Sequence, residues 1–279
     1  MTTPKKASAK KTSAKRGVAT YVYGVLQVAP RAKAIAPKIA KGAKGLPEAQ
    51  APRILETGGG YSLVVSTVPL PTYSAESIEE KLRDLDWIGV AAAAHEMVLE
   101  GAAAIGTVVP MKLFTIFNDD TRAIAHVSKM KRDLDRVVTK IAGCDEWGVR
   151  ILFDEAGALE RKRAEQKAKE ARTPVSGTGF LLRKKAQEET RRVLTFEAKE
   201  EVDDLFDRLK RASKKAVRRP PPNRELAGRV LLDAVFLVPR TRTSTFKSTI
   251  AGTAEELVRE GYQITLTGPW PAYSFVEAR

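Results

Sequence analysis

The pattern of apolar and polar positions over residues 18–153 predicts strands that alternate with helices. Four stretches rich in β-branched and aromatic residues are typical of buried strands: 20–28, 61–68, 107–117 and 147–153. Three other stretches are typical of helices: 74–84, with acidic residues in its first turns, the Ala-rich 87–104, and 118–141, where apolar residues recur at helical spacing. The resulting order, β–β–α–α–β–α–β, predicts an α/β or α+β fold with helices packed on a sheet. A ferredoxin-like arrangement with an extra helix is the simplest topology.

The second half of the chain has a different pattern. Residues 155–172 are strongly charged, a break follows at 173–179, and helical spacing resumes from 180 to about 217. Two amphipathic helices joined by a short Gly/Pro loop predict an αα-hairpin. After the Pro220–Pro222 spacer, the pattern predicts a strand, a helix and a strand over 229–238, 243–259 and 262–267. This piece cannot cover its own core, so we expect it to pack with the hairpin.

These patterns divide the chain into an arm and two domains. Residues 1–17 contain lysine, alanine, serine and threonine with almost nothing to bury, which predicts a disordered basic arm. The ferredoxin-like domain is expected over 18–153, with residues 29–53 as a loop or insertion within it. The C-terminal α/β domain, with the hairpin and a small sheet, is expected over 154–279.

Charge is unevenly distributed along the chain. The formal net charge is +14, from 48 lysines and arginines against 34 acidic residues. Residues 1–17, 18–47 and 208–224 carry +6, +5 and +8, so the remainder totals −5. This distribution argues against a protein that coats nucleic acid uniformly. The basic stretches could steer acidic partners or form solvated faces, and a basic nucleic-acid-associated protein stays the alternative hypothesis.

Composition also bears on the compartment. The single cysteine, Cys144, cannot form an intramolecular disulfide, which favours a reducing environment. No uncharged apolar run approaches the roughly 18–20 residues needed to cross a bilayer. The N-terminus lacks the apolar region of a secretory signal. We therefore expect a cytoplasmic protein without a membrane segment.

Motifs for catalysis or cofactor binding fail on their spacing. His95-Glu96 begins a zinc-protease motif, but Leu99 occupies the position of the second histidine. Gly101 to Gly106 fits the spacing of a phosphate-binding loop without the lysine that must follow. Gly177-Thr178-Gly179 is better explained as a turn than as a phosphate site. We predict no enzyme activity, no cofactor and no metal site, and we interpret His95 as a hydrogen-bonded helix residue.

Several segments together resemble the gas vesicle protein F/L family. They occur in order over about residues 20–277, and they are Tyr21–Val25, His95-Glu96 with Val98, Pro110–Phe117, Glu146–Val149, Gly177–Gly179, Leu182–Lys184, Ala234–Val238 and Leu266–Phe275. Lys112 and Phe114 depart from the family pattern, where arginine and glycine are expected.

The resemblance implies a minor, non-catalytic gas vesicle protein that is required for vesicle formation. Family members are expected to bind the small hydrophobic shell protein and other vesicle proteins, and some are associated with the gas-facing side of the shell. The location implied is the gas vesicle in the cytoplasm. The fold implied is two α/β domains, the first ferredoxin-like. Whether the chain is F-like or L-like stays open at this point.

The C-terminal segment offers candidate partner-binding residues. Trp270, Tyr273 and Phe275 combine aromatic side chains with neighbouring prolines. Aromatic anchors dominate the binding energy of many interfaces. The alternative is that these aromatics close the core of the second domain and contact no partner.

Overall fold

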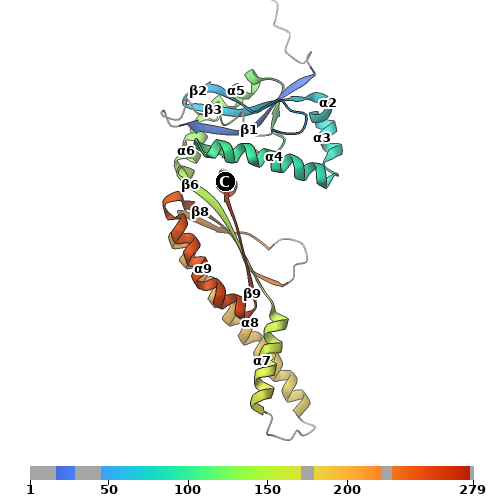
Figure 1. The fold of residues 1–279 in the computed structure, drawn as a ribbon, viewed down its shortest axis with the longest axis vertical. Coiled ribbons are helices and arrows are strands. Elements are labelled where there is room, and N and C mark those ends of the chain that lie inside the picture. The colour runs from blue at the N-terminus through green and yellow to red at the C-terminus, as the bar shows by residue number, and fades with distance from the viewer. Residues whose placement is uncertain (1–16, 29–44, 171–178, 222–227, 277–279) are drawn as a thin grey trace, which may run out of the picture. The chain divides into compact units, whose positions relative to one another are not determined.

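The structure, a computed structural model, describes residues 17–28, 45–170, 179–221 and 228–276 (Figure 1). The predicted basic arm, apart from Gly17, lies outside these residues. The chain forms two compact units, Met1–Ala142 with Pro271–Arg279 (unit 1) and Gly143–Trp270 (unit 2). The chain therefore enters unit 2 once and returns to unit 1 at its C-terminal segment. This division differs from the expected domains 18–153 and 154–279.

Unit 1 contains an antiparallel sheet with the strand order β2-β3-β1-β4. This is the strand order of a ferredoxin-like sheet, which agrees with the predicted topology. A short fifth strand, β5, pairs with the start of β1. The bounds of these strands are β1 Val18–Val28, β2 Arg53–Gly58, β3 Tyr61–Pro69, β4 Gly106–Pro110 and β5 Ile116–Phe117.

Strand β2 is absent from the sequence prediction, which places a loop or insertion at 29–53 and a turn at 58–60 and assigns no element between them. All its residues are half-buried or exposed, so it lacks the apolar run that marks a buried strand. Gly58, which ends the strand, and the two glycines after it have positive φ, a conformation that glycine adopts without strain, and they turn the chain into β3. Gln50 N–H also donates to the Thr67 carbonyl, which ties the preceding segment to β3.

Helices pack on the unit 1 sheet, and three of them begin at side-chain caps. Ser74 accepts from the Ser77 N–H, Asp84 from the Asp86 and Trp87 N–H groups, and Asp119 from the Arg122 N–H. The single helix predicted to end at Ile141 is two helices that meet at Met130. The bounds are α2 Leu70–Tyr73, α3 Ala75–Lys81, α4 Leu85–Ala103, α5 Asp120–Lys129, α6 Lys131–Ile141 and α10 Tyr273–Val276.

Unit 2 repeats the topology of unit 1. Its antiparallel sheet has the order β7-β8-β6-β9, in which second, third, first and fourth strands follow one another as in unit 1. Figure 1 shows α8 and α9 lying along one face of this sheet. The bounds are β6 Cys144–Phe153, α7 Glu155–Glu170, α8 Gly179–Ala212, β7 Lys215–Arg218, β8 Arg229–Pro239, the 3₁₀ helix η2 Arg240–Arg242, α9 Thr243–Glu260 and β9 Tyr262–Trp270.

Two elements of unit 2 differ from the prediction. Strand β6 was assigned to the first domain, but it pairs with β8 and β9 along its two edges. A strand with antiparallel partners on both edges belongs to their sheet, which moves the domain boundary from 153 to 142. The pattern predicts a helix to about 217, but α8 ends at Ala212 and residues 215–218 form β7, because they pair with β8.

The core of unit 2 lies between the sheet and its helices. Side chains from β6, β8, α8 and α9 bury one another there, led by Ile151, Leu205, Leu209, Phe236 and Phe246. Ring pairs connect the layers, with the centroids of Phe236 and Phe246 5.3 Å apart and those of Phe206 and Phe236 5.6 Å apart. The predicted hairpin is present as α7 and α8, linked by a hydrogen bond from Arg163 to Gln187.

Candidate partner-binding site

The three aromatic residues predicted to bind a partner do not form one exposed surface. Trp270 ends β9 in unit 2 and is 39% exposed. Tyr273 belongs to unit 1, where it packs against the core and donates from its hydroxyl to Glu96 Oε2 at 2.7 Å. Phe275 is 1% exposed in the same unit. The core that Tyr273 and Phe275 join is that of unit 1, not that of the second domain as the alternative expected. Trp270 alone presents a large apolar surface.

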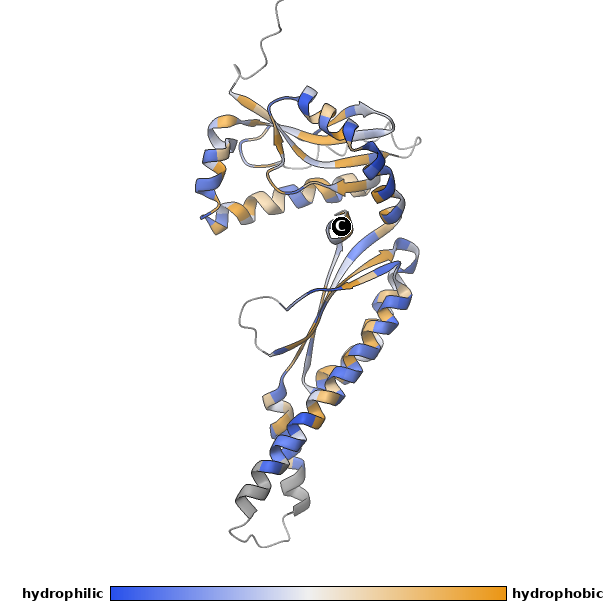
Figure 2. Ribbon diagram, turned by 180° about the vertical axis from the view of Figure 1, so that it is seen from behind, coloured by the Kyte–Doolittle hydropathy of each residue, from blue (hydrophilic) through white to orange (hydrophobic). Residues whose placement is uncertain are grey.

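A larger exposed apolar surface lies on α4. This helix is apolar nearly all round, a composition normally found in helices buried on every side. Figure 2 draws most of it in orange and pale shades. Its outer face nevertheless meets solvent, with Leu85 82%, Val90 57% and Met97 48% exposed. Exposed Gly89, Ala92 and Ala93 lie between them. We call these six residues the α4 outer face.

The charged residues of α4 itself have one sign. The exposed acids Asp86 and Glu100 lie on the same side of the helix. The sequence contains no lysine or arginine between Asp84 and Met111. This is notable in a chain with a net charge of +14. The surface is therefore apolar with an acidic border, and it suits an apolar partner that carries basic residues at its edge.

The inner side of α4 is fixed against the sheet by close packing. Ala91, Val98, Leu99 and Ala102 are buried there. A side chain at Gly24 of β1 would place its Cβ 2.8 Å from Leu99 Cδ2 and 3.0 Å from the Val109 carbonyl oxygen. Only glycine allows the helix and β4 to lie this close to the strand. The sheet therefore holds α4 rigidly and leaves its outer face free for contact.

His95 anchors the same inner side through a buried polar contact. Its Nδ1 lies 2.6 Å from the hydroxyl of Tyr21, which also accepts from the Phe114 N–H at 3.3 Å. His95 is 3% exposed, and burial lowers its pKa from 6.5 to about 4. The imidazole is neutral at neutral pH. The interpretation of His95 as a hydrogen-bonded helix residue is confirmed.

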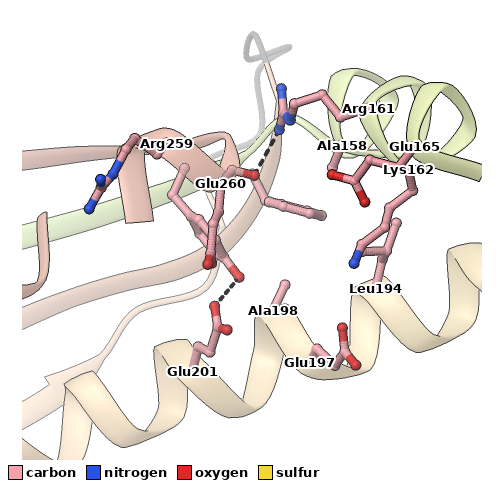
Figure 3. Close-up of a pocket in the computed structure, with 12 residues that line it drawn as sticks. Ala158, Arg161, Lys162, Glu165, Leu194, Glu197, Ala198, Glu201, Arg259 and Glu260 are labelled. Carbon is pink, nitrogen blue, oxygen red and sulfur yellow. Dashed lines mark hydrogen bonds between the residues drawn. The ribbon is translucent and has the colours of Figure 1, made fainter. Parts of the chain in front are cut away.

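Unit 2 contains a pocket of about 310 Å³ between α7, α8 and the start of β9 (Figure 3). Glu197 and Glu201 reach it from α8, Arg161 and Lys162 from α7, and Glu260 from the end of α9. The Tyr262 hydroxyl donates to Glu201 Oε2 at 2.5 Å. Burial and the neighbouring Glu201 carboxylate raise the pKa of Glu260. The lining side chains of the described residues are mainly charged, with Glu197, Glu201 and Glu260 facing Arg161 and Lys162.

Three basic residues of the stretch 208–224, Arg208, Arg218 and Arg219, form ion pairs inside unit 2. Arg219 joins Arg150 on the carboxylate of Asp233, with N–O distances of 2.6 Å for both. Arg218 pairs with Asp203 at 2.5 Å and lies 4.1 Å from the centroid of the Phe206 ring. Side chains held in this way neutralise acids of their own unit. They are poorly placed to neutralise phosphates of a nucleic acid.

Two further features bear on the kind of site. Over the residues that the structure describes, no group of three or more histidine, cysteine or acidic side chains is arranged to hold a metal ion. Within the same residues, no helix is long and apolar enough to cross a bilayer. Cys144 is a free thiol in this structure, and burial raises its pKa.

Sequence reasoning missed the α4 outer face because helical spacing does not tell which side of an apolar helix is covered. The signal was present as the run Ala91–Ala94 and the long interval without a basic residue. These features predict a helix that another element can approach closely. These sequence features do not show that, among the described residues, no element covers this side of α4.

Comparison with known proteins adds to this geometry. A family model described as gas vesicle synthesis protein GvpL/GvpF matches residues 19–277. The chain is 29% identical over 258 residues to gas vesicle protein L of Streptomyces sp. (strain CB03234), covering 91% of each chain. It is 27% identical over 267 residues to gas vesicle protein F of the same strain, covering 93% of this chain and 100% of the relative.

Solved structures share the fold. The crystal structure of gas vesicle protein GvpF from Anabaena sp. PCC7120 matches with a TM-score of 0.65 and 19% identity, covering 94% of this chain and 97% of that one. GvpF from Microcystis aeruginosa matches with a TM-score of 0.61 and 16% identity, covering 93% and 99%. At these identities the likeness establishes the mixed α/β fold over nearly the whole chain.

Proposed function

Because the chain belongs to the gas vesicle synthesis protein GvpL/GvpF family, we propose that it binds the hydrophobic shell protein of the vesicle on the α4 outer face while vesicles form. The role is non-catalytic, and the protein acts in the cytoplasm beside the growing vesicle. The observation that carries the proposal is the exposure of Leu85, Val90 and Met97 on a helix that is apolar nearly all round.

The physical reason is the cost of leaving such surfaces in water. A shell protein that polymerises through apolar surfaces aggregates when those surfaces are free. Contact with the α4 outer face removes apolar area of both proteins from water, at roughly 25 cal/mol for each Å². The acidic border formed by Asp86 and Glu100 favours partners with basic residues next to their apolar surface. Other vesicle proteins with this chemistry are partners of the same kind.

The test is capture of the shell protein by the tagged full-length chain. The variant Val90→Lys/Met97→Lys places two charges on the α4 outer face, and we expect it to fold because both side chains are exposed. We expect capture at least 10-fold weaker, because a buried lysine without a partner is costly. Cells with this variant should also lose flotation.

The matched control is Val193→Lys/Val258→Lys, which changes two exposed valines of unit 2. It adds the same charge to another surface and should leave capture unchanged. Equal capture by all three proteins would overturn the assignment of the shell protein to α4.

The nucleic-acid alternative has less support. Arg218 and Arg219 are engaged with acids of unit 2, which leaves the stretch 208–224 with less free charge than its sequence indicates. Binding of generic duplex that weakens steeply with salt would favour this alternative.

A further inference from the structure

Strand β9 forms one edge of the unit 2 sheet. It pairs with β6 on one side, and in the described part of the chain no strand pairs with its other side. Its sequence from Tyr262 to Trp270 contains no charged residue. A long edge strand of this kind presents a row of free backbone donors and acceptors to any strand that approaches.

The hydrogen-bond pattern shows which backbone groups point outward. The Gly261 carbonyl accepts from the Asp154 N–H at 2.9 Å, so it faces β6. Backbone groups alternate in direction along a strand, which turns those of residues 263 and 265 toward β6 as well. The N–H and C=O groups of Tyr262, Ile264 and Leu266 therefore point away from the sheet.

Other sheet edges carry the usual protections against pairing. Strand β7 has four residues, and two of them are Lys215 and Arg218. Strand β2 contains Arg53 and Glu56, and β4 ends at Pro110. Charges, prolines and short length all discourage edge-to-edge pairing. Strand β9 has none of these protections before Pro269, so its outer edge is open to pairing with another strand.

We propose that two copies of this chain pair antiparallel through β9, with a twofold axis at Ile264. In this register Ile264 lies opposite its equivalent, Tyr262 opposite Leu266 of the second copy, and Gln263 opposite Thr265 of the second copy. The pairing is an interaction beyond the proposed function and uses a different surface.

Self-complementarity is the reason for choosing a second copy as the occupant. The outward backbone groups of residues 262, 264 and 266 bond to those of 266, 264 and 262. Gln263 and Thr265 have exposed side chains, so the polar pairs stay on the solvated face. Ile264 and Leu266 pack against the core on the other face, where apolar meets apolar. A chain with net charge +14 thus pairs through a segment in which no like charges meet.

The same geometry closes the assembly at two copies. An isologous contact uses the same edge of both subunits, and the joined sheet then ends in β7 on each side. Those two ends are short and positively charged. The pairing therefore predicts a closed dimer and not a fibre.

The experiment is sedimentation velocity of the full-length protein over a range of micromolar concentrations. The wild type should sediment with twice the chain mass of 30.5 kDa. Gln263→Lys/Thr265→Lys places lysines opposite lysines across the axis, and we expect dimer dissociation to rise at least 10-fold. Gln263→Lys/Thr265→Glu places lysine opposite glutamate in the same register and should restore the dimer.

A control separates edge pairing from the general effect of added charge. Thr245→Lys/Ser248→Lys adds the same charge at exposed positions of α9 and should remain dimeric. Circular dichroism should be the same for all variants, since the altered side chains are exposed. A monomeric wild type would overturn the proposal, as would a dimer that the Lys/Lys variant leaves intact.

The outcome is also distinguishable from that of the proposed function. If the wild type is monomeric and the β9 Lys/Lys variant no longer captures shell protein, the edge receives a foreign strand and self-pairing is wrong. If only the α4 variant Val90→Lys/Met97→Lys loses capture of the shell protein, that result does not bear on the dimer. The sedimentation measurement then decides whether the chain is dimeric.

Discussion

At the scale of single residues, the contact between His95 and Tyr21 links the inner side of α4 to β1. The Nδ1–hydroxyl distance is 2.6 Å, and the rings of Tyr21 and Tyr23 lie 5.7 and 5.5 Å from that of His95. The imidazole is thus surrounded by aromatic carbon and held in its neutral form. A proton added to it would create a charge in a place where water cannot reach.

This burial makes stability depend on pH. The pKa of His95 is about 4 in the folded chain and 6.5 in the unfolded chain, so the unfolded chain binds more protons in between. The stability that depends on neutral His95 is fully present above pH 6.5 and is lost as the pH decreases toward 4. We expect a loss of about 2 kcal/mol in the free energy of unfolding between pH 7.5 and pH 5. Urea titrations at the two pH values measure it.

Two variants isolate the contribution of His95. His95→Gln removes the titrating ring, so the pH dependence should shrink although overall stability also falls. His126→Gln removes the exposed histidine of α5 and should retain the wild-type dependence. An undiminished dependence in His95→Gln would assign the acid sensitivity to another group.

At the scale of elements, sequence pattern located most helices and strands and failed where burial was incomplete. Strands β1, β3 and β8 are buried on much of their length, and their apolar runs predicted them well. Strands β2 and β7 are edge strands with exposed residues, so pairing and not apolar pattern makes them strands. Strand β6 was recognised but assigned to the wrong sheet, because the apolar pattern along a strand does not show which strands it pairs with.

The candidate sites were less predictable than the elements. The aromatics at 270, 273 and 275 were conspicuous in the sequence, yet burial separates Phe275 from Trp270. Whether an aromatic residue closes a core or meets a partner depends on tertiary contacts from distant segments. The α4 outer face is the opposite case, since its residues look like core residues and are exposed.

An ion-pair cluster fastens three elements of unit 2. Asp233 of β8 has a side chain only 3% exposed and binds Arg150 of β6 and Arg219, which follows β7. Asp233→Asn removes a buried charge from between two cations. We expect it to lower the free energy of unfolding by about 2 kcal/mol, less than for a fully buried pair because both arginines are partly solvated. Chemical denaturation measures the change.

A surface ion pair of the same unit provides the control. Asp203 pairs with Arg218 at 2.5 Å, and both side chains are about a third exposed or more. Asp203→Asn should change stability by less than about 0.5 kcal/mol. Equal effects of the two variants would mean that Asp233 does not fasten the strands.

At the scale of the whole molecule, the chain consists of two units with one strand order, and unit 1 is completed from the far end of the sequence. Helix α10 contacts α6 and β4. Lys140 Nζ donates to the Phe275 carbonyl at 2.7 Å, and Tyr273 bonds to Glu96 of α4. The stability of unit 1 therefore depends on residues that follow unit 2 in the sequence.

Phe275→Ala tests this dependence. Removing a fully buried phenylalanine costs about 3–5 kcal/mol, and the loss should fall on unit 1 alone. Trp87 reports on unit 1 by fluorescence when Trp147 and Trp270 are replaced by phenylalanine. Trp147 reports on unit 2 in a second protein, in which Trp87 and Trp270 are replaced by phenylalanine. The transition seen by Trp87 should move to lower urea, while that seen by Trp147 stays. A shift in both would show that the units unfold together.

Closure of unit 1 by residues 271–276 also has a consequence for synthesis on the ribosome. Domains generally fold in the order in which they are translated, at about 5–20 residues per second. Here the sequence of unit 2 is continuous, whereas unit 1 lacks Phe275 until the tail leaves the exit tunnel. The part made first is thus finished last. During that delay of roughly ten seconds, α4 packs on a core that still lacks Phe275.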